Sequence, residues 1–365
     1  MSRAGVQLGR VLGVPVLVSP SWLLFAGFIL ISFGPQLAQS YGTGRGYTAA
    51  GAFAVLLLVS VLLHEIGHCI VARAFGLPVK SITVTFLAGL TEITEPPQTP
   101  AREYAVAVVG PTISLLLAGV GFGLLPLFEP GSLPYLLSGI VGLSNGLVAA
   151  FNLLPGLPLD GGRVLRSVLW KLTGDPDRST VLAAQSGRVV AVIVVPVLLL
   201  GVLPGLGVTQ LSLSSALLTA LVASFIYVGA NATLTRAQFQ ARVPRASVAA
   251  LARPAIAVPA GTPLAEAVRQ AQAAGAHGVV VVDGLGRPEA VVNEAALLAV
   301  PEERRPWVAV STVARRVVDG MVLDAGLTGE ALLAAMRALP ASEYVVENPL
   351  RVLVTADVAA VVTPG

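Results

Sequence analysis

The chain has 365 residues, of which 55% are hydrophobic and only 12% are charged, and its formal net charge is +3. Soluble domains carry roughly 25% charged residues, so this composition excludes an ordinary soluble protein and predicts a membrane protein. Its single cysteine, Cys69, excludes an internal disulfide. The length allows one membrane domain of several helices and one soluble domain of ordinary size.

Six apolar stretches are long enough to cross a bilayer as helices, which takes about 20 residues each. The expected helices lie near residues 16–34, 50–75, 103–127, 133–156, 188–204 and 210–232. A basic flank precedes the first stretch, as in a signal peptide, but no small-residue cleavage site ends it promptly. We therefore expect it to be retained as an anchor.

Basic residues lie in alternate connections between these stretches. They occur before the first stretch, between the second and third, between the fourth and fifth, and after the sixth, whereas the other connections contain only Arg45. Cytoplasmic loops collect Lys and Arg. The pattern predicts a multi-pass protein of the inner or plasma membrane with both termini in the cytoplasm.

The second stretch contains HEIGH, with His64, Glu65 and His68 in otherwise apolar surroundings. Residues four apart share a helix face, so both imidazoles can point at one ion. H-E-x-x-H is the zinc metalloprotease signature, in which Glu is the general base. Ionisable groups inside a bilayer are rare and usually functional. The alternative is that the two histidines bond other helices and serve structure alone.

Residues 79–94, VKSITVTFLAGLTEIT, alternate as a strand does and are rich in β-branched residues. They predict a small membrane-associated β hairpin or sheet. Its edge could pair with another extended segment, although an ordinary hairpin between helices explains the pattern equally well.

A catalytic zinc site takes three protein ligands and keeps one position open. The best third donor is Asp160 in FNLLPGLPLDGGR, where Pro155, Pro158 and the neighbouring glycines break the helix. Irregular backbone at membrane depth is tolerated only where it lines protein or a water-filled cavity. From spacing alone, Asp160 could equally well cap the next helix.

Together, HEIGH and NLLPGLPLDGG resemble the site-2 protease family of intramembrane zinc metalloproteases, peptidase family M50. The family signatures are HExxH and N-x-x-P-x-x-x-x-D-G, and both are matched in full. The resemblance implies one zinc ion per chain, with His64, His68 and Asp160 as ligands and Glu65 as the general base. It also implies that Asn152 holds the substrate or stabilises the oxyanion.

One position departs from the family pattern. The third core helix of the family often reads G-P-x-x-N, whereas this chain has Ser114 at the place of the Asn. The departure weakens any role assigned to that position and leaves the metal site unchanged.

Beyond about residue 243 the chain is more highly charged and alternates strand and helix patterns. Its halves, 243–303 and 304–365, share the order helix, strand, turn, strand, helix, and they resemble a tandem CBS pair. That resemblance implies an adenine nucleotide at a T-x-D motif, here Thr355 and Asp357. The first half has Asn293 and no clear Asp, so a purely structural dimerisation module is an equal alternative.

The predicted fold class is a mainly α membrane protein with about six transmembrane helices and a small β element, occupying residues 1–242, followed by a soluble α/β tandem CBS-like domain. By family analogy, we expect regulated intramembrane proteolysis of single-span membrane proteins, such as anti-sigma factors or signal-peptide remnants. The bilayer is a partner, a homodimer through the CBS-like domain is possible by the resemblance, and we expect no nucleic acid. Two alternative functions stay open. One is a non-hydrolytic metal-binding protein, either a transporter or a pseudoprotease, and the other is a nucleotide sensor that gates a pore.

Overall fold

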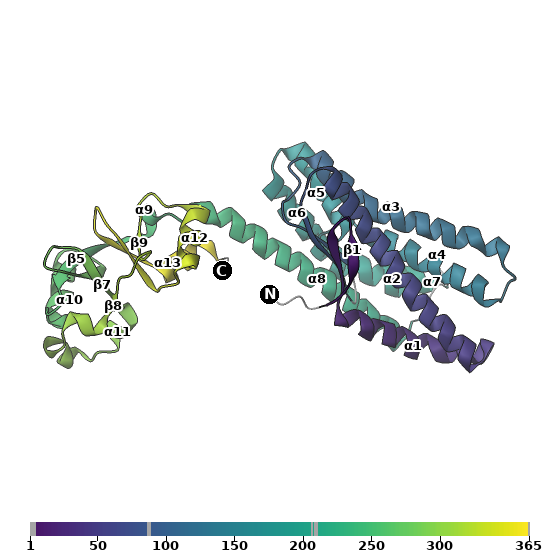
Figure 1. Ribbon diagram of the computed structural model, residues 1–365, viewed down its shortest axis with the longest axis horizontal. Coiled ribbons are helices and arrows are strands. Elements are labelled where there is room, and N and C mark those ends of the chain that lie inside the picture. The colour runs from purple at the N-terminus through teal and green to yellow at the C-terminus, as the bar shows by residue number, and fades with distance from the viewer. Residues whose placement is uncertain (1–4, 86–88, 206, 208–210, 364–365) are drawn as a thin grey trace. The chain divides into compact units, whose positions relative to one another are not determined.

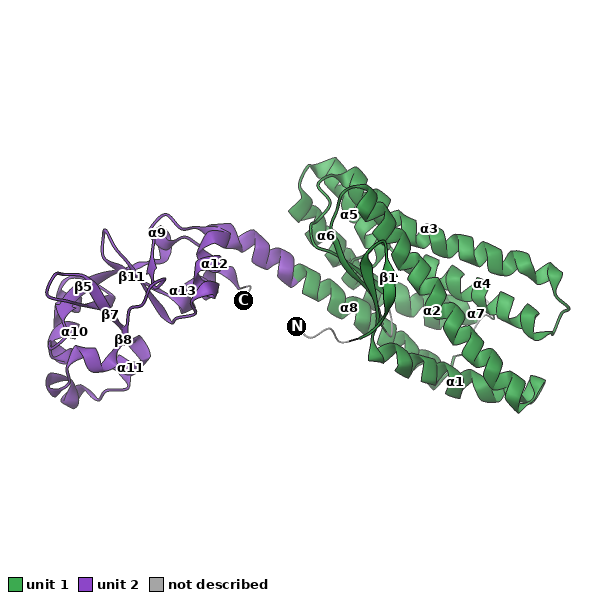
Figure 2. Ribbon diagram, viewed as in Figure 1, with its two compact units in different colours: residues 1–234 green, residues 235–365 purple. Residues whose placement is uncertain are grey.

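The computed structural model describes residues 5–85, 89–205, 207 and 211–363. The chain forms two compact units, Met1–Leu234 and Thr235–Gly365 (Figure 2). The division falls inside helix α8 (Leu213–Arg242), whereas the predicted boundary lies at the end of that helix. Phe239, in the last turns of α8, packs against the apolar core of the second unit, so these turns belong to it.

Six helices among the described residues are long and apolar enough to cross a membrane, as predicted. They span Pro20–Tyr41, Thr43–Ala74, Pro100–Leu127, Leu133–Asn152, Pro176–Gly205 and Ser215–Arg245. Helices α1 (Pro20–Tyr41), α2 (Thr43–Ala74), α3 (Pro100–Leu124) and α4 (Leu133–Asn152) pack consecutively side by side (Figure 1).

Several of these helices begin at a capping side chain that a proline follows. A side-chain oxygen at the N-cap satisfies a free backbone N–H, and proline fits the first turn because its missing N–H is not needed there. The caps are Ser19 before α1, Thr99 before α3, Ser132 before α4 and Asp175 before α6 (Pro176–Val189).

Some predicted helix limits were wrong. The first helix begins at Pro20 rather than near residue 16, because residues 14–18 form a strand. The fourth ends at Asn152 rather than 156, ahead of the proline-rich loop. The fifth begins at Pro176 instead of 188, since the Asp175 cap starts α6 early and π-helical turns continue it to Gly205.

A four-stranded sheet, in the order β1-β2-β3-β4, completes the first unit. Strands β3 (Val79–Val84) and β4 (Gly89–Ile93) form the predicted antiparallel hairpin. The sequence prediction missed β1 (Val6–Val11) and β2 (Val14–Val18). These two strands are joined by a two-residue turn with positive φ at Leu12 and Gly13.

The sheet packs against the C-terminal half of α2. Val14, Val16 and Ile82 bury their side chains against Cys69. The parallel pairing of β2 with β3 fixes the hairpin in place, and β4 forms one edge of the sheet. As a result, β4 lies next to the helix that carries the HEIGH motif.

The second unit contains a seven-stranded sheet in the order β8-β7-β6-β5-β11-β10-β9, whose edge strands are β8 (Ala314–Arg316) and β9 (Val322–Leu323). Both halves show the predicted element order. The first half has α10 (Leu264–Ala273), β6 (Gly278–Val282), β7 (Pro288–Val292) and α11 (Glu294–Leu298), and the second has α12 (Gly329–Ala338), β10 (Glu343–Val346), β11 (Arg351–Val354) and α13 (Thr355–Val362). Strand β5 (Arg253–Pro259) pairs with both β6 and β11 and so joins the halves.

Candidate metal centre

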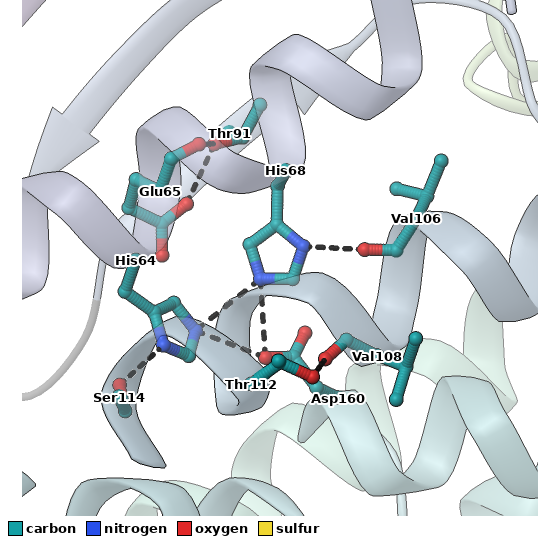
Figure 3. Close-up of polar contacts among 9 residues, drawn as sticks. All are labelled: His64, Glu65, His68, Thr91, Val106, Val108, Thr112, Ser114 and Asp160. Atoms are coloured by element: carbon teal, nitrogen blue, oxygen red, sulfur yellow. Dashed lines mark hydrogen bonds and ion pairs between the residues drawn. The ribbon is translucent and has the colours of Figure 1, made fainter. Parts of the chain in front are cut away.

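The two histidines of HEIGH lie one turn apart on a buried face of α2. His64 is 4% exposed and His68 is 3% exposed. Their rings meet edge to face with centroids 4.9 Å apart. The helix spacing expected from the motif therefore gathers both imidazoles in one place (Figure 3).

Helix α3 holds each imidazole through its Nδ1 atom. His68 Nδ1 lies 2.6 Å from the carbonyl oxygen of Val106, and His64 Nδ1 lies 2.9 Å from Ser114 Oγ. A carbonyl can only accept, so His68 Nδ1 donates and the lone pair is left on Nε2. Such partners orient metal-binding histidines in proteins.

Asp160 completes a triangle with the two free ring nitrogens. Its Oδ2 atom lies 3.0 Å from His64 Nε2 and 3.2 Å from His68 Nε2, and the two nitrogens are 3.2 Å apart. Ligand atoms around tetrahedral zinc stand roughly 3.3–3.6 Å apart at ordinary bond lengths. The triangle therefore has to open by only a few tenths of an ångström to hold such an ion.

Gly110 of α3 leaves the space that an ion needs. A β-carbon built at this position would lie 2.3 Å from His68 Nε2 and 2.5 Å from His64 Nε2. Those separations are close to a metal–nitrogen bond length. The donor set and this glycine both fit a bound zinc ion.

A tightly packed loop brings Asp160 to the histidines. After α4 ends, residues 153–159 fold back before α5 (Asp160–Thr173) begins. A β-carbon at Gly162 would lie 2.1 Å from Leu157 N, and one at Gly187 would lie 1.9 Å from Leu157 O. These glycines allow backbone to touch backbone. Leu159 is the N-cap of α5, so Asp160 is its first residue and points to the histidines instead of capping the helix.

Glu65 lies beside this triangle and is held by strand β4. Its Oε2 accepts a 2.6 Å hydrogen bond from Thr91 Oγ1, and a β-carbon at Gly89 would lie 2.3 Å from its Oε1. The carboxylate and the two imidazoles bring their donor atoms within 4.8 Å of one another. Asp160 thus approaches both imidazoles to 3.0–3.2 Å, whereas the Glu65 carboxylate is engaged by Thr91.

The remaining predicted residues lie elsewhere. Asn152 is the last residue of α4, and no hydrogen bond joins its side chain to the described residues of the centre. In the second unit, Thr355 Oγ1 donates to Ala341 O at 2.5 Å. Asp357 Oδ1 accepts from Arg253 Nη2 at 2.6 Å, and the buried Oδ2 of Asp357 has no hydrogen-bond partner among the described residues.

Sequence reasoning missed the polar contacts that orient the site. It gave Thr91 no role, although Thr91 lies within the strand pattern that was recognised. It discounted Ser114 because the family often has Asn there, yet Ser114 bonds His64. A helical wheel of α3 would have placed Val106, Gly110 and Ser114 on one face, since they are spaced four apart.

The part of the chain that carries this centre matches a known protein family. Residues 52–138 and 132–195 match the sequence model of peptidase family M50. The chain is 38% identical over 189 residues to sll0528 of Synechocystis sp., named as a proposed zinc metalloprotease, which covers 50% of this chain and 49% of that protein. It is 34% identical over 135 residues to MJ0611 of Methanocaldococcus jannaschii, named likewise, covering 32% of this chain and 70% of that protein.

Among solved structures, the chain is similar to the site-2 protease from Methanocaldococcus jannaschii. The identity is 28% and the TM-score is 0.44, over 63% of this chain and 95% of that one. The chain spans about half the length of sll0528.

The fold and the site define a multi-pass membrane protein with a cluster of two buried histidines and two adjoining carboxylates, Glu65 and Asp160, that is suited to a metal ion. The chain belongs to peptidase family M50, which confirms the family predicted from HEIGH and NLLPGLPLDGG. Membership of this family implies zinc at the cluster.

Proposed function

We propose that this protein is an intramembrane zinc metalloprotease of the site-2 type, which hydrolyses peptide bonds of transmembrane substrate helices. The observation that carries the proposal is the triangle of His64, His68 and Asp160 beside Glu65, inside helices long enough to span a membrane. A His, His, carboxylate set with an open fourth position is typical of hydrolytic zinc.

In the proposed mechanism, His64, His68 and Asp160 hold the ion. Bound there, a zinc ion would supply Lewis-acid chemistry, which polarises a carbonyl and makes water easier to deprotonate. Glu65 takes a proton from the attacking water and returns it to the leaving amine. Thr91 keeps the Glu65 carboxylate turned toward that water, and Asn152 holds the substrate backbone or donates to the developing oxyanion.

The substrate is a single-span membrane protein, such as an anti-sigma factor or a signal-peptide remnant, trimmed beforehand outside the membrane. A helix hides its peptide bonds, so the substrate has to unwind before attack. Strand β4 could bind the unwound substrate, because it forms an edge of the sheet and its Thr91 contacts Glu65. An unwound segment that pairs with this edge lies beside the general base.

The membrane orientation follows from the basic loops. Both termini lie in the cytoplasm of a cell whose inner or plasma membrane holds the six spans. Asp160 starts a helix that follows the fourth span, so the centre opens toward the cytoplasm, from which water enters.

The second unit is proposed to be a tandem CBS domain that regulates the protease or dimerises it. The repeated order of helix, strand, strand and helix supports this assignment. The unpartnered Oδ2 of Asp357 supports an adenine nucleotide near Thr355 and Asp357, since a buried acceptor needs a donor such as a ribose hydroxyl.

The decisive experiment uses the full chain purified in detergent without chelator. About one zinc per chain, lost in His68→Ala and Asp160→Ala, is the expected result, together with cleavage of a single-span test protein. Glu65→Gln should keep its zinc and lose cleavage. Retained cleavage in Glu65→Gln contradicts the protease mechanism. If the unaltered chain binds zinc but cleaves nothing, the protein is a non-hydrolytic metal-binding protein.

A further inference from the structure

Glu103 is a buried acid that the proposed mechanism does not use. It lies in the first turn of α3, and its side chain is 4% exposed. Its Oε2 forms an ion pair with Arg166 Nη1 of α5, whose side chain is 17% exposed. Burying two charges costs several kcal/mol each before pairing offsets the cost. In a chain with so few charged residues, a buried ion pair of this kind therefore indicates a specific role.

Arg166 joins three helices at once. Besides the ion pair with α3, its Nε donates a 2.6 Å hydrogen bond to Thr180 Oγ1 of α6. Its guanidinium also lies over the Trp170 ring, 5.4 Å from the ring centroid. The planar, forked guanidinium suits such multiple contacts, which a lysine could not reproduce.

Both helices that the ion pair joins carry parts of the metal centre. Val106, which orients His68, lies one turn after Glu103 on α3, and Gly110 follows one turn later. Asp160 is the first residue of α5, the helix that carries Arg166. In the part of the chain that the structure describes, no other side-chain hydrogen bond or ion pair links α3 to α5.

We propose that Glu103 and Arg166 are positioning residues that set the Asp160 carboxylate at its distance from the two imidazoles. The hydrophobic effect between apolar helix faces is non-directional, so it does not by itself select one axial register. One residue of sliding moves a helix by about 1.5 Å, whereas metal–ligand distances are held to about 0.2 Å. The ion pair supplies the directional contact that fixes this register.

This inference rests on the proposed zinc site, so its test measures metal binding. The full chain is purified with Glu103→Gln or Arg166→Gln, and zinc affinity is measured by competition with a chelator. The absorption spectrum with Co²⁺ in place of zinc reports the ligand geometry. Arg253→Gln is the matched control, because it breaks the ion pair between Arg253 and Asp357 in the other unit.

We expect both Gln variants to bind zinc about 10- to 100-fold more weakly, as loss of an orienting partner does. Their Co²⁺ spectra should change while far-UV circular dichroism stays the same, and Arg253→Gln should match the unaltered chain. A folded Gln variant whose zinc affinity is within twofold of the unaltered chain overturns the inference.

Where a Gln variant does not fold, Thr180→Val and Arg166→Lys carry the test. Thr180→Val keeps the size of its side chain and removes the hydrogen bond to Arg166, and Arg166→Lys keeps the charge but loses the forked contacts of the guanidinium. A smaller loss of zinc affinity is therefore expected in both. Unchanged affinity and an unchanged Co²⁺ spectrum in these two variants overturn the proposal. If the unaltered chain binds no zinc, the proposed function and this inference both fail.

Discussion

Thr91 Oγ1 donates a 2.6 Å hydrogen bond to the carboxylate of Glu65, and so ties an edge strand of the sheet to the acid of the HEIGH motif. The same hydroxyl lies 3.1 Å from the backbone carbonyl of Glu65. Since β4 and α2 are separated in sequence by β3, this contact exists only because the sheet folds back onto the helix.

Replacing Thr91 by Val should lower kcat about tenfold with KM and zinc content unchanged. Valine has the same shape but no hydroxyl, so the Glu65 carboxylate loses its orientation, and a general base contributes roughly 10²- to 10⁴-fold to the rate. Thr91→Ser keeps the hydroxyl and should retain most of the activity. Equal rates for the two variants, measured on one single-span substrate, would show that the hydroxyl does not position Glu65.

Gly110→Ala should abolish zinc binding while the protein still folds. The added carbon would lie 2.3 and 2.5 Å from the two Nε2 atoms, and the rings cannot retreat because hydrogen bonds to Val106 and Ser114 of the same helix hold them against α3. Metal analysis of the purified protein checks this result. Gly119→Ala, in the same helix with no atom within 4 Å of its added carbon, should bind zinc normally.

Ser114→Ala should weaken zinc binding about 10- to 100-fold, because His64 loses the partner of its Nδ1 atom. A chelator titration gives the affinity. The control is Ser144→Ala, whose hydroxyl donates to the Val141 carbonyl of its own helix. Should the two serine variants bind zinc equally well, Ser114 has no role in orienting His64.

Local patterns of the sequence predicted which helix face and which loop carry the candidate site, but not the contacts around it. The four-residue spacing of His64 and His68 defines a helix face without any tertiary information. The glycines and prolines around Asp160 likewise mark a loop. By contrast, the contact of Thr91 with Glu65, and the fit of Gly110 under both imidazoles, depend on how distant elements pack.

The missed strands have a similar explanation. Residues 14–18 are five apolar residues that run almost directly into the first span, and a short apolar run cannot be assigned to strand or helix by periodicity. What separates them is Ser19, whose side chain caps α1. A cap followed by proline was therefore a boundary signal already present in the sequence.

Gly187→Ala should destabilise the first unit, because its added carbon would lie 1.9 Å from the backbone oxygen of Leu157 in the loop before Asp160. Overpacking costs typically about 1–3 kcal/mol, and a backbone atom cannot rotate away as a side chain does, so we expect the upper part of this range. Thermal unfolding in detergent should show a lower Tm, and zinc should be released at lower temperature than from the unaltered chain.

Gly201→Ala, which meets no atom within 4 Å in the π-helical turns of the same span, should leave the Tm unchanged or raise it, since Ala favours helix over Gly by about 1 kcal/mol. A Gly187→Ala protein as stable as Gly201→Ala would mean that the loop does not pack on α6 as closely as described.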